Sequence, residues 1–317
     1  MERELDFEKP VLEIERTIEK LRHRDAHGKG ENRDRIEALE ERLKEVTKEV
    51  YQNLTAWQTV QVARHPRRPV LRDYIELLFS DFVELHGDRC FGDDPAMQCG
   101  FATLSGVKVM LIGSSKGKNV EENIKRNFGM ARPEGYRKAL RIMKLAEKFN
   151  LPIVCLVDTP AAFPGLDAEE RGQHEAIARN LTEMARLEVP VVVVVTGEGG
   201  SGGALAIGIG DAVLMLQNAI YSVIPPEGCA AILWRDASFA PQAAEAMKLT
   251  AKSLLELGVI DEIIPEPDGG AHRNPEQTAA GLKTVLLKYL KELSTYPSAK
   301  LLAKRFEKFS GMGKFNE

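Results

Sequence analysis

A run of five consecutive valines, Val191–Val195, constrains the fold of this chain more than any other segment. No polar residue interrupts the run, whereas a strand with one face in water alternates apolar and polar residues. Strands that are buried on both faces belong to parallel sheets covered by helices on each side. The sequence therefore predicts a strand over 189–195 at the centre of an α/β fold.

The segments around this strand have the order of repeated strand-loop-helix units. A strand over 152–157 precedes a loop over 158–167 and a helix over 168–187, and the valine strand precedes a loop over 196–202 and a further helix. Right-handed crossovers between parallel strands place such loops at the same, carboxyl edge of the sheet. We therefore expect the two loops to be neighbours.

Periodicity and turn residues predict the remaining elements. Residues 1–60 show two amphipathic helices separated by a polar turn over 25–32, and Pro66 and Pro69 end this region. The predicted organisation is an N-terminal helical hairpin over 1–69, an α/β domain over 70–295 and a helical tail over 296–317. The other expected elements are strands over 100–104, 107–112, 212–216 and 220–224, helices over 133–149, 275–293 and 298–309, and a helix, turn and strand over 249–264.

Composition excludes several classes of protein. The 317 residues include 43 Lys+Arg and 47 Asp+Glu, so the net charge of -4 creates no overall basic field for nucleic acid. The four cysteines form no C-x-x-C pair, which argues against a disulfide framework and against a metal site in this chain. A polar amino terminus and the lack of a long apolar run argue against a signal peptide and a membrane span. We therefore expect a cytoplasmic protein.

The segment after the valine strand is rich in glycine, with five glycines in residues 197–203. Glycines at a strand-to-helix turn let backbone N–H groups approach a ligand without a Cβ, and the helix N-terminus adds partial positive charge. The segment is therefore predicted to bind an anion or a developing oxyanion, although a tight turn is the simpler alternative. A dinucleotide site is disfavoured, because the G-x-G-x-x-G match at Gly197, Gly199 and Gly202 lacks an acidic residue on a following strand.

The same segment also fits the nucleophile elbow of serine hydrolases. Residues 199–203 match G-x-S-x-G between a strand and a helix, with Ser201 as the nucleophile. Asp261 and His272 follow in the chain order of that class. Against this function, the sequence has no upstream HGGG-like motif, and His272 lies in a hydrophilic segment. A serine hydrolase is thus the alternative function, and a noncatalytic scaffold subunit is another.

A second candidate segment, Asp158-Thr-Pro-Ala-Ala-Phe-Pro-Gly165, follows the strand over 152–157. Its two prolines stiffen the loop, and the helix after it offers free N–H donors. Asp158 at the strand end could act in catalysis or could cap the amides of the adjacent loop. With the glycine-rich segment it is expected to form a cleft with two backbone walls.

Basic residues follow the strand over 107–112. Residues 113–118, Gly-Ser-Ser-Lys-Gly-Lys, fall one residue short of a P-loop, so ATP binding is not supported. Lys116, Lys118 and Arg126 could attract the anionic groups of a ligand or a partner. A solvated basic loop is the simpler interpretation.

Blocks of sequence dispersed along the chain form a recognisable set. They are Ala63-Arg-His-Pro-Arg-Arg-Pro69, Gly87-Asp-Arg89, Arg126-Asn-Phe-Gly-Met130, Pro133-Glu-Gly-Tyr-Arg-Lys-Ala139, Glu169-Glu-Arg-Gly-Gln173, Ala176-Ile-Ala-Arg-Asn180, 197–208, Pro226-Glu-Gly-Cys-Ala230 and 265–274. Together they resemble the α subunits of bacterial and plastid acetyl-coenzyme A carboxylase carboxyltransferase. The resemblance covers nearly the whole chain and is strongest over 56–276.

The resemblance implies an α/β fold of the crotonase type, built of repeated ββα units, with the N-terminal helices as an extension. It implies an α2β2 enzyme whose separate β subunit carries a zinc ribbon. The implied reaction transfers a carboxyl group from carboxybiotin to acetyl-CoA and gives malonyl-CoA, the first committed step of fatty acid biosynthesis. The carboxybiotin is implied to arrive on the biotin carboxyl carrier protein, with biotin carboxylase as a further partner.

The resemblance also implies roles for individual residues. Backbone N–H groups of Gly202 and Gly203 would stabilise the oxyanion on the biotin ureido oxygen, and Ser201 would be structural. Ala161 stands where the family commonly has glycine, so the sequence does not require a positive φ there. The remaining residues of the implied carboxybiotin pocket, besides Ala161, are Ala162, Phe163, Gly165, Gly199 and Gly200.

Overall fold

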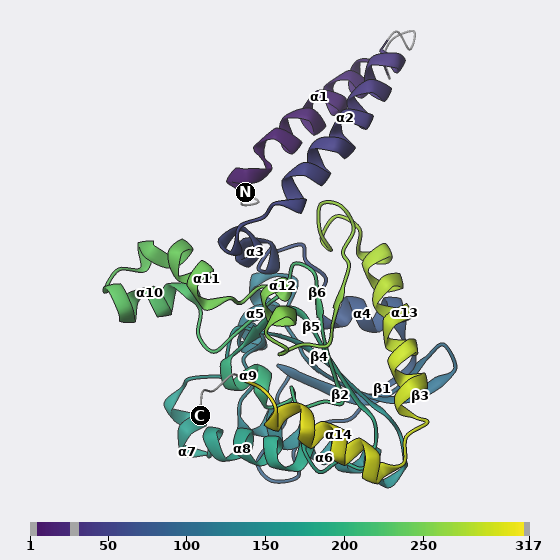
Figure 1. The fold of residues 1–317 in the computed structure, drawn as a ribbon, viewed down its shortest axis with the longest axis vertical. Helices are drawn as coiled ribbons and strands as arrows, with labels where there is room; N and C mark the ends of the chain where they lie inside the picture. Colours follow the sequence, from purple (N-terminus) through teal and green to yellow (C-terminus); the bar gives the residue numbers. More distant parts are fainter. Residues whose placement is uncertain (1–4, 26–31, 314–317) are drawn as a thin grey trace.

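The computed structural model describes residues 5–25 and 32–313 (Figure 1). Within these residues, eight strands form one sheet in the order β1-β2-β3-β4-β5-β6-β8, and β7 pairs with β5 beyond the end of β6. The first three strands are antiparallel and the others run parallel. The strands are β1 (Ser80–Glu84), β2 (Met97–Leu104), β3 (Val107–Ser114), β4 (Ile153–Thr159), β5 (Val191–Gly200), β6 (Ala212–Leu216), β7 (Ile220–Ser222) and β8 (Glu262–Ile264).

The predicted central strand is confirmed in β5. Its residues are buried along the whole strand, and its neighbours β4 and β6 are buried as well. Val192–Val195 pair with β4 on one side and with β6 on the other, both in parallel register. An uninterrupted apolar run therefore marks the middle of the sheet, where neither face meets water.

Helices cover the two faces of the sheet. Figure 1 shows α6 (Pro133–Lys148) and α8 (Gln173–Met184) along one side, and α4 (Leu71–Leu78) and α13 (Pro275–Leu293) along the other. The remaining α-helices are α1 (Lys9–Asp25), α2 (Arg33–Gln52), α3 (Ala56–Ala63), α5 (Val120–Lys125), α7 (Leu166–Glu170), α9 (Ser201–Leu205), α10 (Pro226–Trp234), α11 (Ala240–Met247), α12 (Ala251–Glu256) and α14 (Ser298–Ser310).

The single helix predicted over 168–187 is wrong, because the structure has two helices there. α7 ends at Glu170 and α8 begins at Gln173. Gly172 between them has φ 80°, which lies in the left-handed region and cannot continue a right-handed helix. The strand predicted over 220–224 is also shorter, since β7 ends at Ser222.

The two helices predicted in the N-terminal region are present as α1 and α2, and they project from the rest of the molecule (Figure 1). Their base contacts the segment after β8 through charged and aromatic groups. Tyr51 donates a hydrogen bond to Glu8 Oε1 at 2.6 Å, and Arg273 Nη2 lies 3.4 Å from the same oxygen. The rings of His65 and His272 stack with their centroids 3.9 Å apart.

The C-terminal helix α14 is anchored by one buried arginine. Arg305 is 1% exposed and pairs with Asp211 at 2.7 Å. Its Nη1 also donates to the carbonyl oxygens of Met184 and Leu187, both at 2.8 Å. The helix is therefore fixed to the segment that leads into β5.

No helix in the described ranges is long and apolar enough to cross a membrane.

Candidate functional site

The two candidate segments lie side by side, as the parallel topology predicted. Thr159 at the end of β4 is paired with Gly199 in β5. A Cβ on Gly200 would fall 1.9 Å from the carbonyl oxygen of Pro160, and a Cβ on Gly203 would fall 2.5 Å from the carbonyl carbon of Ala161. Glycine is required at both positions, because the segments touch through their backbones.

The loop predicted over 196–202 is wrong, since β5 continues through Gly200 and α9 begins at Ser201 without an intervening loop. The glycines at the end of β5 pair with β7, where Gly199 lies opposite Tyr221. The glycine-rich sequence therefore serves the close approach of neighbouring backbones more than it serves a turn.

Gly202 and Gly203 stand in the first turn of α9. The first four N–H groups of an α-helix have no acceptor within the helix, so donors are available at this end. Gly203 is buried and Gly202 is half-buried. Ser201 just before them has φ 50°, a left-handed conformation that costs a serine on the order of 1 kcal/mol or more.

The residues of the serine-hydrolase alternative do not meet. Asp261 accepts a hydrogen bond from the Val213 N–H at 2.6 Å and pairs with Lys308 at 2.5 Å. Neither ring nitrogen of His272 has a hydrogen-bond partner among the described residues. His272 thus activates neither Ser201 nor any other nucleophile through a hydrogen bond in this structure, and the alternative is not favoured.

The segment 158–165 is held in a fixed shape by contacts from outside and by one hydrogen bond within it. Gln173 donates through Nε2 to the carbonyl oxygens of Phe163 and Ala131, both at 2.9 Å. The guanidinium of Arg132 lies 4.2 Å from the centroid of the Phe163 ring. Thr159 Oγ1 donates to the Ala161 carbonyl oxygen at 2.7 Å, and Ala161 itself has no positive φ. The alanine is therefore accommodated without backbone strain.

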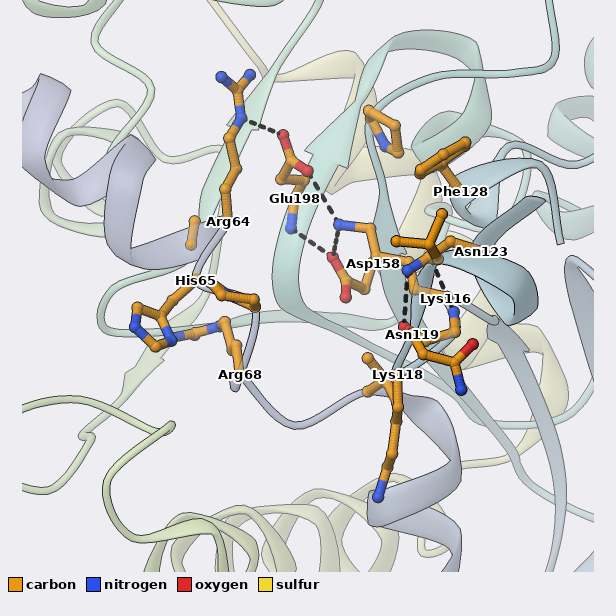
Figure 2. A pocket seen from close by; sticks show the side chains of 16 residues that line it. Arg64, His65, Arg68, Lys116, Lys118, Asn119, Asn123, Phe128, Asp158 and Glu198 are labelled. Atoms are coloured by element: carbon orange, nitrogen blue, oxygen red, sulfur yellow. Dashed lines mark hydrogen bonds and ion pairs between the residues drawn. The ribbon is translucent and has the colours of Figure 1, made fainter. Parts of the chain in front are cut away.

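A network of charged side chains, most deeply buried at Asp158 and Glu198, lies where the two segments begin (Figure 2). Lys116 Nζ lies 2.7 Å from Asp158 Oδ1 and 2.9 Å from Glu198 Oε2. Arg64 Nε lies 2.6 Å from Glu198 Oε1, and its Nη1 lies 2.6 Å from Glu227 Oε1. The Glu198 N–H also donates to Asp158 Oδ1 at 2.9 Å. The network thus joins β4 and β5 to the segments that precede α4 and α5.

Charge pairing outweighs burial within this network. Burial alone would raise the pKa of Glu198, but the cations of Lys116 and Arg64 lower it to about 2. Burial alone would lower the pKa of Lys116, but Asp158 and Glu198 raise it above its usual value. Glu198 and Lys116 are therefore both charged at neutral pH.

A cavity of about 460 Å³ opens beside the network. Figure 2 shows that its side chains come from segments far apart in the sequence. Charged and polar groups line one part of it and apolar groups line the rest. The lining residues are Ala63, Arg64, His65, Pro66, Arg68, Val70, Lys116, Gly117, Lys118, Asn119, Val120, Asn123, Phe128, Asp158, Pro160 and Glu198.

The cations singled out in the sequence have partners within the chain. Lys116 belongs to the buried network, and Lys118 pairs with Asp73 while keeping a side chain that is 47% exposed. Arg126 Nη1 donates to the Pro95 carbonyl oxygen at 2.7 Å and to Ser115 Oγ at 2.8 Å. The predicted site therefore gathers its glycines and its 158–165 wall in one place, whereas Lys116 and Arg126 direct their charges into the chain.

Arg64 and Glu198 were not singled out from the sequence as site residues. Each lies within a block that carries the family resemblance, 63–69 for Arg64 and 197–208 for Glu198. A buried carboxylate in an otherwise apolar strand needs a partner cation, and that requirement was the available signal. Its partner could not be named, because Arg64 and Glu198 are far apart along the chain.

Solved structures of related fold support the predicted class. Transcarboxylase 12S has a TM-score of 0.57 at 22% identity over 71% of this chain and 42% of that chain. The β subunit of Pseudomonas aeruginosa geranyl-CoA carboxylase has a TM-score of 0.56 at 18% identity, over 77% of this chain and 46% of that chain. A Pseudomonas malonate decarboxylase hetero-tetramer has a TM-score of 0.57 at 18% identity, over 68% of this chain and 86% of that chain. The crotonase-type α/β fold is thereby confirmed.

Sequence comparisons then give the family. A family model described as acetyl co-enzyme A carboxylase carboxyltransferase-like matches residues 4–313. The acetyl-coenzyme A carboxylase carboxyl transferase subunit alpha of Methylococcus capsulatus is 58% identical over 313 residues, which are 99% of this chain and 98% of that protein. The protein of the same name from Anoxybacillus flavithermus is 57% identical over 314 residues, 99% of this chain and 97% of that protein. The chain therefore belongs to the family of acetyl-coenzyme A carboxylase carboxyltransferase α subunits.

Proposed function

We propose that this chain forms the carboxybiotin-binding half of a carboxyltransferase that transfers a carboxyl group from carboxybiotin to acetyl-CoA and produces malonyl-CoA. Membership of the family supports this reaction. The observation that carries the assignment of the site is the backbone contact between the segment at Ala161 and the first turn of α9 at Gly203. In this proposal residues 70–295 form the carboxyltransferase domain, with 1–69 as a helical extension and 296–317 as a tail.

Backbone N–H groups are the proposed catalytic groups. When bound, carboxybiotin supplies the carboxyl group, and Gly202 and Gly203 donate hydrogen bonds to its ureido oxygen as negative charge develops there. The N-terminal end of α9 adds partial positive charge at the same point. A preorganised donor of this kind lowers a barrier by about 3 to 4 kcal/mol, and it requires no side-chain nucleophile.

The pocket around these donors is proposed to be built largely from backbone and small side chains. The fit is supported by the lack of Cβ atoms where the walls meet, since a side chain at Gly200 or Gly203 would enter the opposite wall. Phe163, fixed by Arg132 and Gln173, gives one wall a flat ring. The proposed wall residues are Ala161, Ala162, Phe163, Gly165, Gly199 and Gly200.

Acetyl-CoA is proposed to be held mainly by a separate β subunit in an α2β2 assembly in the cytoplasm. The relatives are designated subunit alpha, which supports a partner subunit. This chain covers only 42% of the transcarboxylase 12S chain, which leaves the rest of that longer chain without a counterpart here. The β subunit is proposed to carry the zinc ribbon. The carboxyl group is proposed to arrive from biotin carboxylase on the biotin carboxyl carrier protein. Lys118, whose side chain is half-exposed, is proposed to attract anionic groups.

Reconstitution tests this proposal. The purified chain is mixed with its β subunit, and malonyl-CoA-dependent carboxyl transfer to biocytin is followed. We expect activity in the mixture and none in either subunit alone. Full activity of the isolated chain would contradict the composite site, and an inactive but correctly assembled mixture would favour a noncatalytic scaffold.

A further inference from the structure

Two buried carboxylates stand where the two proposed pocket walls begin. Asp158 directly precedes the wall that includes Ala161, and Glu198 directly precedes the glycines that lead into α9. Their side chains are only 8% and 10% exposed. The two residues are also joined by a hydrogen bond, in which the backbone N–H of Glu198 donates to Asp158 Oδ1 at 2.9 Å. Two like charges this close and this buried would favour proton uptake by one of them unless a cation intervened.

Lys116 is the cation that contacts both carboxylates. It comes from a third segment, between β3 and α5, and Figure 2 shows its ammonium group between Asp158 and Glu198. Its side chain is 17% exposed, and its Cγ would lie 2.9 Å from a Cβ placed on Gly129. The lysine is therefore held by close packing as well as by charge.

We propose that Lys116 is a positioning residue for carboxyl transfer: because its ammonium group contacts both Asp158 and Glu198, it sets the spacing between the two pocket walls. The proposal rests on the function proposed above for these walls. Lys116 touches no reacting atom, and its effect reaches the donors of Gly202 and Gly203 through the backbone. Displacing a catalytic group by about 1 Å can reduce a rate on the order of 100-fold.

The remaining charged groups at the cavity leave this role to Lys116. Arg64 contacts Glu198 but is also shared with Glu227. Arg68 is paired with Glu266 at 2.5 Å, and Lys118 is paired with Asp73. Burial lowers the pKa of His65 to about 4, so its ring is neutral at neutral pH. Lys116 is therefore the cation whose Nζ lies within 3 Å of both carboxylates.

Removal of Lys116 should leave a signature in the pH profile. The cations left near the two buried carboxylates would be Arg64, which is shared with Glu227, and Arg68, which is paired with Glu266, so one of the carboxylates would take up a proton more readily. Because a bound proton replaces the missing positive charge, the lost alignment should return in part as the pH falls. A lysine that only filled space would cause the same relative loss at every pH.

The test uses the assembled enzyme with Lys116→Met in the α subunit and carboxyl transfer from malonyl-CoA to biocytin as the assay. At about pH 8 we expect kcat to fall on the order of 10- to 100-fold, with KM for malonyl-CoA unchanged. The deficit should shrink toward about pH 6, and Lys116→Arg should keep most of the activity. Lys144→Met is the matched control, because Lys144 also contacts two carboxylates, Glu147 in α6 and Glu183 in α8, and does not line the cavity.

A charge-balanced variant sharpens the test. Lys116→Met combined with Glu198→Gln should recover part of the lost activity and lose the pH dependence. An equal deficit at every pH, without recovery in the double variant, would overturn the positioning role. If Lys116→Met does not assemble, Glu198→Gln alone serves: a loss of about tenfold or more in kcat supports the role, and wild-type kcat overturns it.

Gly203→Val distinguishes this inference from the proposed function beneath it. If the Gly203→Val enzyme assembles and is active, the proposed oxyanion site is contradicted, regardless of the result for Lys116. If the Gly203→Val enzyme is inactive and the Lys116→Met enzyme is fully active, only the positioning role of Lys116 is contradicted. The two failures therefore give different pairs of results.

Discussion

Gly200 and Pro160 approach so closely that a Cβ on the glycine would fall 1.9 Å from the carbonyl oxygen of the proline. Backbone meets backbone at this point, so no side-chain movement can relieve the overlap. The contact lies between the end of β5 and the segment that follows β4, where the two proposed pocket walls start. It ties the integrity of the fold to the spacing of the candidate site.

Gly200→Ala should therefore destabilise the protein. We expect a loss of about 3 kcal/mol or more in the free energy of unfolding, because the sheet must open or the 158–165 segment must move. Urea denaturation would measure it. Gly92→Ala is the control, since a Cβ at Gly92 would meet nothing within 4 Å. Equal stability of the two variants would show that the neighbouring backbone yields easily.

Gly203→Val should abolish most carboxyl transfer in the assembled enzyme. A Cβ there would lie 2.5 Å from the backbone of Ala161. Gly202→Ala should be milder, because its Cβ would meet only the flexible side chain of Ile177 at 3.3 Å. The assay is biocytin carboxylation, and the ratio of the two activities checks the order. If Gly202→Ala were the more damaging change, the tighter contact would lie on the side of α9 that faces Ile177 and not on the side that faces Ala161.

Ser201→Ala should leave considerable activity, since the proposed site works through backbone N–H groups. Ser201→Gly should be at least as stable as the wild type, because glycine adopts the left-handed φ of 50° without strain. Activity assays and thermal denaturation test these expectations. A serine hydrolase would instead lose nearly all activity in both variants, and the wild type would be labelled by a fluorophosphonate probe.

Acid should weaken the base of the N-terminal helices. Burial lowers the pKa of His65 from 6.5 to about 4, so the unfolded chain binds a proton first and this contribution to stability is lost as the pH falls between those values. Burial would raise the pKa of Glu8, but the nearby His272 ring, the hydrogen bond from Tyr51 and the charge of Arg273 lower it from 4.5 to about 2, so its contribution is lost over that lower range.

Melting temperature as a function of pH tests this prediction. The wild type should lose stability as the pH falls from about 6.5 to about 4, and His65→Phe should flatten the decline because no proton can bind there. His174→Gln is the control, since its side chain is 82% exposed. The same decline in His65→Phe as in the wild type would assign it to other groups.

Much of the sheet could be predicted because burial leaves a strong pattern in sequence. The valine run marked the centre of β5, and the parallel order of β4 and β5 predicted that their following segments would touch. The strand's extension to Gly200 could not be predicted, because it depends on pairing with β7. The break at Gly172 could not be predicted, because residues 169–175 are polar and carry no apolar period whose interruption would mark it, and a single glycine does not by itself indicate a left-handed φ.

The candidate site was predictable to a similar depth. A site built from backbone N–H groups can be recognised by glycines that lie close together in the sequence, as they do over 197–203. The bridge from Lys116 to Asp158 and Glu198 has no such trace, because its members come from three segments that only the folded sheet brings together. Lys116 therefore looked like a surface cation in sequence and is an interior counter-ion in the structure.

The direct passage from β5 into α9 has a mechanical consequence. Because α9 begins directly after β5, the N–H groups of Gly202 and Gly203 are fixed to a strand that is buried along its whole length. Such donors cannot travel toward a reactant. If they act as proposed, the carboxybiotin on its carrier protein must move into the correct geometry, while the hydrogen-bond donors of this chain stay fixed in place.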